Sequence, residues 1–425
     1  MVRLSGPRAV AIASTIVRGR TPLDALPSHS QRHVVIVDPV SGDRLDGALC
    51  AVMRAPRSYT GEDVVELSCH GSPPLLRVVI ERLCAQGARL ASPGEFTRRA
   101  FLNGRLDLTQ AEAVALLIGA RTERAMMLAA RGVAGELGRS LRAARERLVD
   151  LIAGLEVSLD FPEDGVGIDP AAAGVVVEML VADVMALRTR AQRGRIVRDG
   201  ITVALVGAPN AGKSSLLNAL LGRERAIVSP IAGTTRDVIE ATIELEGIPV
   251  RLLDTAGLGA PRDGLEAEGI KRTRAAIEES DLLLVVVDGS RPPPCDVFEE
   301  TAARRRILVR AKSDLPPDPA AARMDQAVAV SALTGAGLGV LTERIGHSVT
   351  SGHGGGELIA SLRQMELLDV LEKALVAARR ALQEAPLEVA LVDFKDALRH
   401  VCSLLGVDVG DSVLDRIFAT FCVGK

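Results

Sequence analysis

A glycine-rich loop in the middle of the chain has the residue types and spacing that bind phosphate groups. The four fixed positions of the pattern G-x-x-x-x-G-K-[ST] are Gly207, Gly212, Lys213 and Ser214. An aliphatic run precedes the loop and a helical pattern follows it, so backbone N–H groups can close around phosphates at the positive end of a helix. We expect Lys213 to reach the β- and γ-phosphates and the Ser214 hydroxyl to bind Mg²⁺.

Three later segments supply the other parts of a guanine-nucleotide site, in the expected order. Thr235 can complete the Mg²⁺ shell, Asp254 can hold Mg²⁺ through water, and the Gly257 N–H can contact a γ-phosphate. Asp314 can accept hydrogen bonds from both N1–H and N2–H of guanine, an arrangement that adenine cannot use. Together with the loop, these segments predict GTP binding. The predicted nucleotide-binding residues are Asn210, Ala211, Gly212, Lys213, Ser214, Ser215, Ser229, Pro230, Ile231, Ala232, Gly233, Thr234, Thr235, Asp254, Thr255, Ala256, Gly257, Lys312, Asp314, Ser331, Ala332 and Leu333.

The site departs from common GTP-binding proteins in two places. The guanine-reading motif is usually Asn-Lys-x-Asp, but its first position here is Ala311, so the amide that reaches the base is absent. Guanine selectivity through Asp314 should survive, with weaker affinity. Leu258 follows Gly257, so no glutamine stands there to orient the attacking water. Glu266 is a candidate for that role, and its alternative interpretation is an ordinary acid on a solvent-exposed helix.

The overall composition limits the classes of function. At about 150 residues per domain, 425 residues predict roughly three domains. The 51 Lys and Arg residues stand against 54 Asp and Glu, which argues against nucleic-acid binding through charge alone. With no Trp and one Tyr, base-stacking platforms for single strands are not expected. Six cysteines without a C-x-x-C pair indicate free thiols, and aliphatic runs such as Leu282–Val287 are too short to span a membrane. We therefore expect a cytoplasmic protein with no membrane segment.

The hydrophobic pattern predicts a multidomain protein of α/β and α+β class. Residues 1–105 are strand-rich and mixed, with strands expected at His33–Val37 and Gly47–Met53. Residues 106–198 are helical, and Thr109 with Glu112 has the form of a capping box. A leucine and isoleucine stripe in this segment indicates the core of a helical bundle rather than a partner groove. The stripe consists of Leu137, Leu141, Leu148, Ile152, Leu155 and Leu159.

Residues 199–350 alternate short aliphatic runs with helical patterns, which is typical of βαβ units and a mostly parallel sheet. Residues 351–425 begin with a glycine-rich linker and are then helical. We therefore expect a Ras-like G domain inserted between two helical segments that pack together. The strands expected in the G domain are Ile201–Val206, Val250–Leu253, Leu282–Val287, Ile307–Val309 and Ala327–Val330.

Segments outside the nucleotide-binding block add a family resemblance. Residues 59–67 read Tyr-Thr-Gly-Glu-Asp-Val-Val-Glu-Leu, residues 93–101 read Pro-Gly-Glu-Phe-Thr-Arg-Arg-Ala-Phe, and the chain ends Phe-Cys-Val-Gly-Lys, in the pattern C-x-G-K. With the nucleotide motifs, these segments resemble the MnmE family of tRNA-modification GTPases, also called TrmE, over almost the whole chain. The end pattern is the most specific piece, because a generic P-loop protein has no reason to end that way.

The resemblance implies an N-terminal folate-binding domain (residues 1–105) that forms homodimers, and a helical domain made from residues 106–198 and 351–425. Relatives begin upstream of the position of Met1, so the N-terminal domain is expected to be truncated at its start. By the resemblance, Cys422 is a catalytic residue near a 5-formyl- or methylene-tetrahydrofolate. The residues expected to contact this folate are Arg3, Glu66, Arg105 and Lys425.

The resemblance also implies a potassium-stimulated GTPase in which Glu266 orients water. The family acts with a flavoprotein partner, MnmG (also called GidA), to add a carboxymethylaminomethyl-type group at C5 of the wobble uridine of certain tRNAs. The potassium ion is expected to be held by Asn210, Ser229, Ile231 and Thr234.

Two other classes of function compete with this interpretation. A ribosome-assembly GTPase would need an RNA-binding module, and no KH-type Gly-x-x-Gly segment or basic tail follows residue 350. A regulatory GTPase switch without modification chemistry of its own stays open, because that chemistry depends on the partner's flavin.

Overall fold

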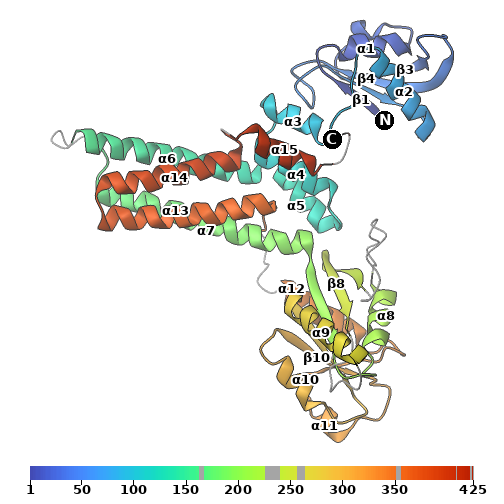
Figure 1. The fold of residues 1–425 in the computed structure, drawn as a ribbon, viewed down its shortest axis with the longest axis vertical. Coiled ribbons are helices and arrows are strands. Elements are labelled where there is room, and N and C mark those ends of the chain that lie inside the picture. The colour runs from blue at the N-terminus through green and yellow to red at the C-terminus, as the bar shows by residue number, and fades with distance from the viewer. Residues whose placement is uncertain are drawn as a thin grey trace. The chain divides into compact units, whose positions relative to one another are not determined.

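The computed structural model describes residues 1–161, 167–224, 240–255, 264–350, 356–407, 409–421 and 424, and it describes the side chains of helix α9 only at residue 271 and from residue 273 onward. The chain forms two compact units (Figure 1). The first unit comprises residues 1–116, 131–185 and 361–425, and the second comprises residues 117–130 and 186–360. Part of the expected helical segment thus belongs to the second unit, and the division into four sequence segments stays a prediction.

The N-terminal part of the first unit is built on an antiparallel sheet with the strand order β1-β5-β4-β3-β2. Val34 and Ile36 of β3 point to the same face of the sheet, because successive side chains of a strand alternate, and both belong to the buried core that also includes residues of helix α1. The two strands expected from the sequence are confirmed, and both begin earlier than predicted. The elements are β1 (Val2–Ser5), α1 (Ala9–Ile16), β2 (Val17–Arg18), a 3-10 turn (Leu23–Ala25), β3 (Ser30–Val37), β4 (Arg44–Met53), β5 (Val64–Ser68) and α2 (Pro73–Ala85).

Helices make up the rest of the first unit, and three of those given below (Leu108–Ile118, Glu123–Val133 and Pro170–Asp199) are divided between the two units. Helix α14 packs against both α6 and α13, and these long helices lie side by side in Figure 1. The stripe of α6 is buried from Leu137 to Leu155 and half-buried at Leu159, so its assignment to a bundle core is confirmed. The helices are α3 (Glu95–Leu102), α4 (Leu108–Ile118), α5 (Glu123–Val133), α6 (Glu136–Asp160), α7 (Pro170–Asp199), α13 (Leu362–Glu384), α14 (Leu387–Leu405) and α15 (Asp411–Ala419).

The capping box expected at Thr109 and Glu112 is wrong. The cap of α4 is Asp107, whose carboxylate accepts the Gln110 N–H at 2.9 Å while the Gln110 side chain accepts the Asp107 N–H at 3.0 Å. Glu112 is buried and accepts hydrogen bonds from Ser361, Arg363 and Gln364 around the start of α13. The pattern shifted by two residues because an aspartate caps as well as a threonine, and Glu112 is taken by a distant segment.

The second unit contains a six-stranded sheet in the order β11-β10-β9-β6-β8-β7. Neighbouring strands are parallel except for β7, which pairs antiparallel with β8. The five expected runs correspond to strands, whereas β7 was missed because it is an edge strand whose polar and apolar residues alternate, so it is not an aliphatic run. The elements are β6 (Ile201–Val206), α8 (Lys213–Arg223), β7 (Glu240–Leu245), β8 (Ile248–Asp254), α9 (Gly264–Glu279), β9 (Leu282–Asp288), α10 (Cys295–Glu300), β10 (Arg306–Ala311), α11 (Pro319–Ala322), β11 (Val328–Ala329) and α12 (Leu338–Thr350).

Among the helices that the structure describes, none combines the length and the apolar character needed to cross a bilayer.

Candidate active site

The glycine-rich loop lies between β6 and α8 and has the backbone that a phosphate cradle needs. Asn210 and Gly212 have φ values of 61° and 103°, in the left-handed region that glycine and asparagine tolerate best. A Cβ atom on Gly207 would lie 2.2 Å from the Val286 carbonyl oxygen of β9, so only glycine fits there. The expected strand–loop–helix context is therefore present.

Lys213 begins α8 and lies buried against the loop. Its Nζ donates hydrogen bonds to the carbonyl oxygens of Gly207 at 3.2 Å and Ala208 at 3.0 Å. Burial lowers the pKa of Lys213, and the negative charge of Asp254 opposes this shift. Ser214 and Ser215 follow on the exposed side of the first turn. The loop thus holds an ammonium group and a hydroxyl at one helix N-terminus.

Asp254 ends β8 directly beside the loop strand, because it is in register with Leu205 of β6. Its Oδ1 atom is buried and has no hydrogen-bond partner among the described residues. Buried polar atoms without partners are rare, and a bound ion or water is the usual explanation. The carboxylate therefore fits a hydrated Mg²⁺. The neighbouring Thr255 hydroxyl donates to the Leu205 carbonyl at 2.7 Å, so it faces the sheet.

The residues predicted to read the base meet at the ends of β10 and β11. The Asp314 carboxylate accepts a hydrogen bond from the Ser331 hydroxyl at 2.6 Å, which orients it. Lys312 has a φ of 58° and pairs through Nζ with Asp288 at 2.7 Å. Burial raises the pKa of Asp288, but the hydrogen bonds from Lys312 and Ser290 outweigh it and hold that pKa below its usual value. Sequence reasoning missed Asp288, although its place at the end of an aliphatic strand was a usable signal. Of the two residues after Ser331, Ala332 is half-buried and Leu333 is exposed.

Ala311 is buried between this base-reading loop and the phosphate loop. A Cβ atom on Gly212 would lie 3.5 Å from the Ala311 Cβ atom, so the two loops are in contact here. The side chain that usually joins them, an asparagine amide, is replaced by a methyl group. The departure seen in the sequence is therefore at a structural contact point.

We predict that Ala311→Asn binds GDP about fivefold more tightly than the parent, equivalent to about 1 kcal/mol, because the amide supplies a missing hydrogen bond. Titration of GDP against both forms measures the difference. Ala311→Leu, which has similar bulk and no amide, is the control and should show no gain. Equal affinity of the parent and the asparagine variant would contradict the prediction.

Several expected site residues lie outside the described residues. They are Ser229, Pro230, Ile231, Ala232, Gly233, Thr234, Thr235, Ala256, Gly257, Cys422 and Lys425. Glu266 falls within the backbone of α9, and its side chain is likewise outside the description. The potassium site and the water-orienting role thus stay predictions.

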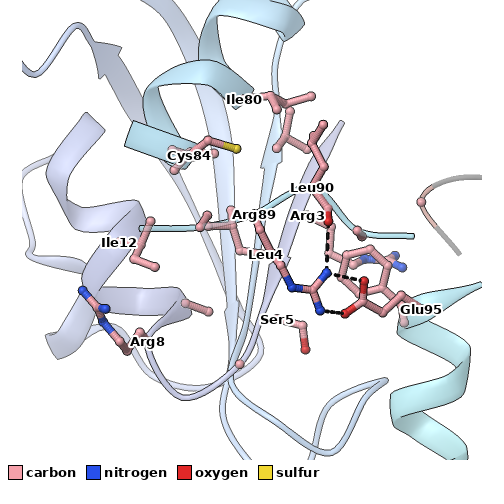
Figure 2. A pocket seen from close by; sticks show the side chains of 18 of the residues that line it. Arg3, Leu4, Ser5, Arg8, Ile12, Ile80, Cys84, Arg89, Leu90 and Glu95 are labelled. Atoms are coloured by element: carbon pink, nitrogen blue, oxygen red, sulfur yellow. Dashed lines mark hydrogen bonds and ion pairs between the residues drawn. The ribbon is translucent and has the colours of Figure 1, made fainter. Parts of the chain in front are cut away.

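A second candidate site is a cavity of about 440 Å³ in the N-terminal domain (Figure 2). Apolar side chains, including Leu4, Ile12 and Ile80, form one part of its lining. Arg3 lines the cavity, pairs with Glu66 at 2.7 Å, and lies over the rings of Tyr59 and Phe96. These contacts fix the guanidinium of Arg3.

The two ends of the chain meet at this cavity. Gly424, of the terminal C-x-G-K pattern, lines it together with Arg3. Helix α15, which precedes Gly424 in the chain, packs on α3. The packing is close at Gly94, where a Cβ atom would lie 2.8 Å from the Phe418 carbonyl oxygen. Arg105 is exposed beside Gly61 and does not line the cavity. The structure therefore brings together Arg3, its partner Glu66 and, of the C-terminal pattern, Gly424, but not Arg105.

Arg89 and Glu95 form a two-point ion pair at the same cavity, drawn with dashed lines in Figure 2. The hydrogen bond from Arg89 outweighs the opposing effect of burial and lowers the pKa of Glu95 to about 2. A carboxylate with a lowered pKa stabilises the folded state above its ordinary pKa, and this contribution is lost as the pH falls toward the lowered value. The ion pair should therefore be strongest near neutral pH.

We predict that Glu95→Gln lowers the free energy of unfolding by about 1–2 kcal/mol at pH 7. This value is smaller than the lowered pKa alone would give, because Arg89 is exposed and solvent screens the ion pair. The difference should shrink as the pH falls from 4.5 toward 2. Denaturant unfolding at several pH values measures it, with Glu81→Gln on the exposed face of α2 as control. A difference that does not change with pH would refute the role assigned to the charge.

The fold and the site define a P-loop GTP-binding protein whose G domain is inserted in sequence between helical segments. Two family models match the chain: "GTP-binding protein TrmE N-terminus" over residues 1–105 and "MnmE helical domain" over residues 108–422. The chain belongs to the MnmE family of tRNA-modification GTPases. The tRNA modification GTPase MnmE of Thermus thermophilus is 45% identical over 431 residues, which cover 100% of this chain and 95% of that protein.

Two further similarities were found. The tRNA modification GTPase MnmE of Koribacter versatilis is 42% identical over 438 residues, covering 100% of this chain and 96% of that protein. A crystal structure of an Era variant from Aquifex aeolicus, bound to GDP and aluminium fluoride, is 29% identical with a TM-score of 0.30, covering 41% of this chain and 66% of that one. Family membership confirms the resemblance seen in the sequence and sets aside the ribosome-assembly alternative.

Proposed function

We propose that this chain acts in the cytoplasm as a homodimer with the flavoprotein MnmG to add a carboxymethylaminomethyl-type group at C5 of the wobble uridine of certain tRNAs. The observation that carries the proposal is the similarity to curated tRNA modification GTPases over the full length of the chain. A regulatory switch that shared only the G domain with this family would have no need of the N-terminal domain or of the terminal C-x-G-K pattern.

The GTPase part of the proposal assigns a role to each described residue of the nucleotide site. Lys213 would neutralise the β- and γ-phosphates, and Asp314, oriented by Ser331, would read the guanine edge. Mg²⁺, when bound, neutralises charge on the phosphates. The Ser214 hydroxyl and, through water, the Asp254 carboxylate would hold this ion, in agreement with the unpartnered Oδ1 of Asp254 among the described residues.

The modification part assigns a tetrahydrofolate to the N-terminal cavity. This cofactor would supply a one-carbon unit when bound. A concave site with apolar walls and a few fixed polar groups is what a flat, polar-edged ring system requires. The Arg3–Glu66 pair would provide donors and an acceptor for that edge, and Leu4 and Ile12 would provide apolar contact. Gly424 at the cavity supports a position of the neighbouring Cys422 close to the folate.

We further propose that potassium, held at Asn210, accelerates GTP hydrolysis, and that Glu266 positions the attacking water. The absence of a glutamine after Gly257, together with the place of Asn210 inside the phosphate loop, supports this proposal. The proposal predicts faster hydrolysis in potassium than in sodium, with no difference in Asn210→Ala. Glu266→Ala should reduce the rate about 10²–10⁴-fold with little change in nucleotide affinity. Equal rates in both salts, or a Glu266→Ala rate within about threefold of the parent, would refute the respective role.

The decisive experiment measures modified wobble uridine in tRNA from cells that lack the gene and carry a plasmid copy. The parent chain should restore the modification, and Cys422→Ser should fail to restore it while hydrolysing GTP at the parental rate. Cys295→Ser, at an exposed cysteine of the G domain, is the matched control and should restore it. Normal modification in cells without the gene would overturn the proposal in favour of a regulatory switch.

A further inference from the structure

The turn between β7 and β8 lies against Arg124 of α5, within the second unit. Glu246 and Gly247 form the turn with φ values of 53° and 74°, the conformation of a tight two-residue hairpin. Arg124 donates from Nη1 to the Glu246 carbonyl oxygen at 3.2 Å. A Cβ atom on Gly247 would lie 2.9 Å from the Arg124 Cβ atom, so the close approach depends on glycine. The turn therefore packs directly against the Arg124 side chain.

The same guanidinium also holds the segment that leaves the G domain. Arg124 pairs from Nη2 with the Glu357 carboxylate at 2.7 Å, and Glu357 is buried. Each end of the guanidinium fork thus serves a different segment, and a lysine with a single ammonium group could not replace it. One side chain joins a turn of the sheet to a linker more than a hundred residues later in the chain.

This linker, residues 356–360, is named the strap here because it is fastened along α7. The Leu358 N–H donates to the Arg190 carbonyl at 3.1 Å, and Arg190 donates from Nε to the Gly356 carbonyl at 2.5 Å. Gly194 permits the contact, since a Cβ atom there would lie 2.0 Å from the Leu358 carbonyl oxygen. Leu358, with 1% of its surface exposed, is buried in this arrangement. The strap is a defined structural element rather than a loose connection.

The hairpin connects the turn to the nucleotide site. Its strands pair without interruption from the turn, at Leu245 and Ile248, to the far end, at Glu240 and Leu253. The far end of β8 carries Asp254, whose buried Oδ1 has no hydrogen-bond partner in the described part of the chain and lies at the predicted Mg²⁺ site. Packed elements transmit a shift at one end because they are not continuously deformable. A change at Asp254 therefore has a direct route to the turn and to Arg124.

We propose that Arg124 is a coupling residue that transmits the nucleotide state from the β7–β8 hairpin to the strap. When the hairpin shifts between the GDP and GTP states, the Arg124–Glu357 ion pair loosens or tightens the strap on α7. The strap continues directly into Ser361 and Arg363, which hydrogen-bond Glu112. The inference rests on GTP binding and is independent of the tRNA chemistry.

Hydrogen–deuterium exchange of the full chain tests the proposal at the Leu358 amide. In the parent, the exchange rate of this amide should differ about fivefold or more between the GDP-bound state and the state with a non-hydrolysable GTP analogue, both with Mg²⁺. Fivefold is the lower end of typical coupling between two sites. Arg124→Ala should lose this difference while binding both nucleotides as the parent does. Arg121→Ala, which removes an exposed arginine just before the start of α5, should keep it.

Two outcomes would overturn the proposal: equal exchange in both nucleotide states of the parent, or a retained difference in Arg124→Ala. Because Arg124→Ala leaves the Glu357 carboxylate buried without this partner, it can also impair folding. The double variant Arg124→Ala/Glu357→Ala removes both charges, and it too should lose the nucleotide-dependent difference. Absence of nucleotide binding in the parent would refute the GTPase assignment itself, which the same titration reveals separately.

Discussion

Replacing Lys213 with alanine is expected to abolish detectable GTP binding and turnover. The Lys213 ammonium group is held against the carbonyl oxygens of Gly207 and Ala208, inside the loop that would surround the phosphates. Removing one partner of a buried charge pair costs about 2–5 kcal/mol, which corresponds to a loss of affinity of about 30- to 5,000-fold. No other lysine or arginine stands in the loop between Gly207 and Ser214.

Titration with a fluorescent GDP analogue and a phosphate-release assay measure the two effects of Lys213→Ala. Lys373→Ala is the matched control, because it removes the same charge from an exposed position on α13. The melting temperature should stay near that of the parent, since the variant also relieves the burial of an ammonium group. Unchanged GTP turnover would contradict the assignment of the phosphate site.

Asp314→Asn is expected to exchange the preference for guanine for a preference for xanthine. The Ser331 hydroxyl donates to Oδ1 of Asp314 at 2.6 Å. An asparagine can keep this hydrogen bond through its carbonyl oxygen and present its amide N–H groups to the base. Xanthine carries an oxygen where guanine carries the 2-amino group, so the amide can donate to it. Guanine instead presents donors that the amide nitrogen cannot accept.

Competition between GDP and xanthosine diphosphate measures the exchange, which we expect to be about 10²-fold or larger because a buried polar edge would be left unpaired. Asp318→Asn is the control for charge: Asp318 caps α11 nearby, and asparagine is an equally good cap. An Asp314→Asn variant that still prefers guanine would show that residues 312–314 do not read the base.

Local patterns determined most of the G domain. The four fixed positions of the phosphate loop are contiguous, so their chemistry and their strand–loop–helix context can be read without any knowledge of distant contacts. The aliphatic runs gave β6, β8, β9, β10 and β11, because strands buried on both faces are continuously apolar. The strand β7 escaped this reading: its sequence, Glu-Ala-Thr-Ile-Glu-Leu, alternates polar and apolar residues as an edge strand does.

Helical periodicity likewise predicted the buried stripe of α6, but it did not determine which polar residues cap a helix and which bind distant segments. Thr109 and Glu112 have the spacing of a capping box, yet Asp107 and Gln110 form the box that caps α4. Glu112 instead receives hydrogen bonds from Ser361 and Arg363, about 250 residues away. Two candidate caps two residues apart are equivalent locally, and only the tertiary partners of Glu112 separate them.

The sequence by itself thus determined the family, the nucleotide chemistry and the order of the segments, since each depends on residues close together in the chain. Only the tertiary structure placed Arg3 and Gly424 in the lining of one cavity, and Arg124 between the β7–β8 turn and Glu357. Side-chain periodicity specifies which face of an element is buried, but not which distant element covers it. That choice depends on packing and on the pairing of buried charges, which are properties of the whole folded chain.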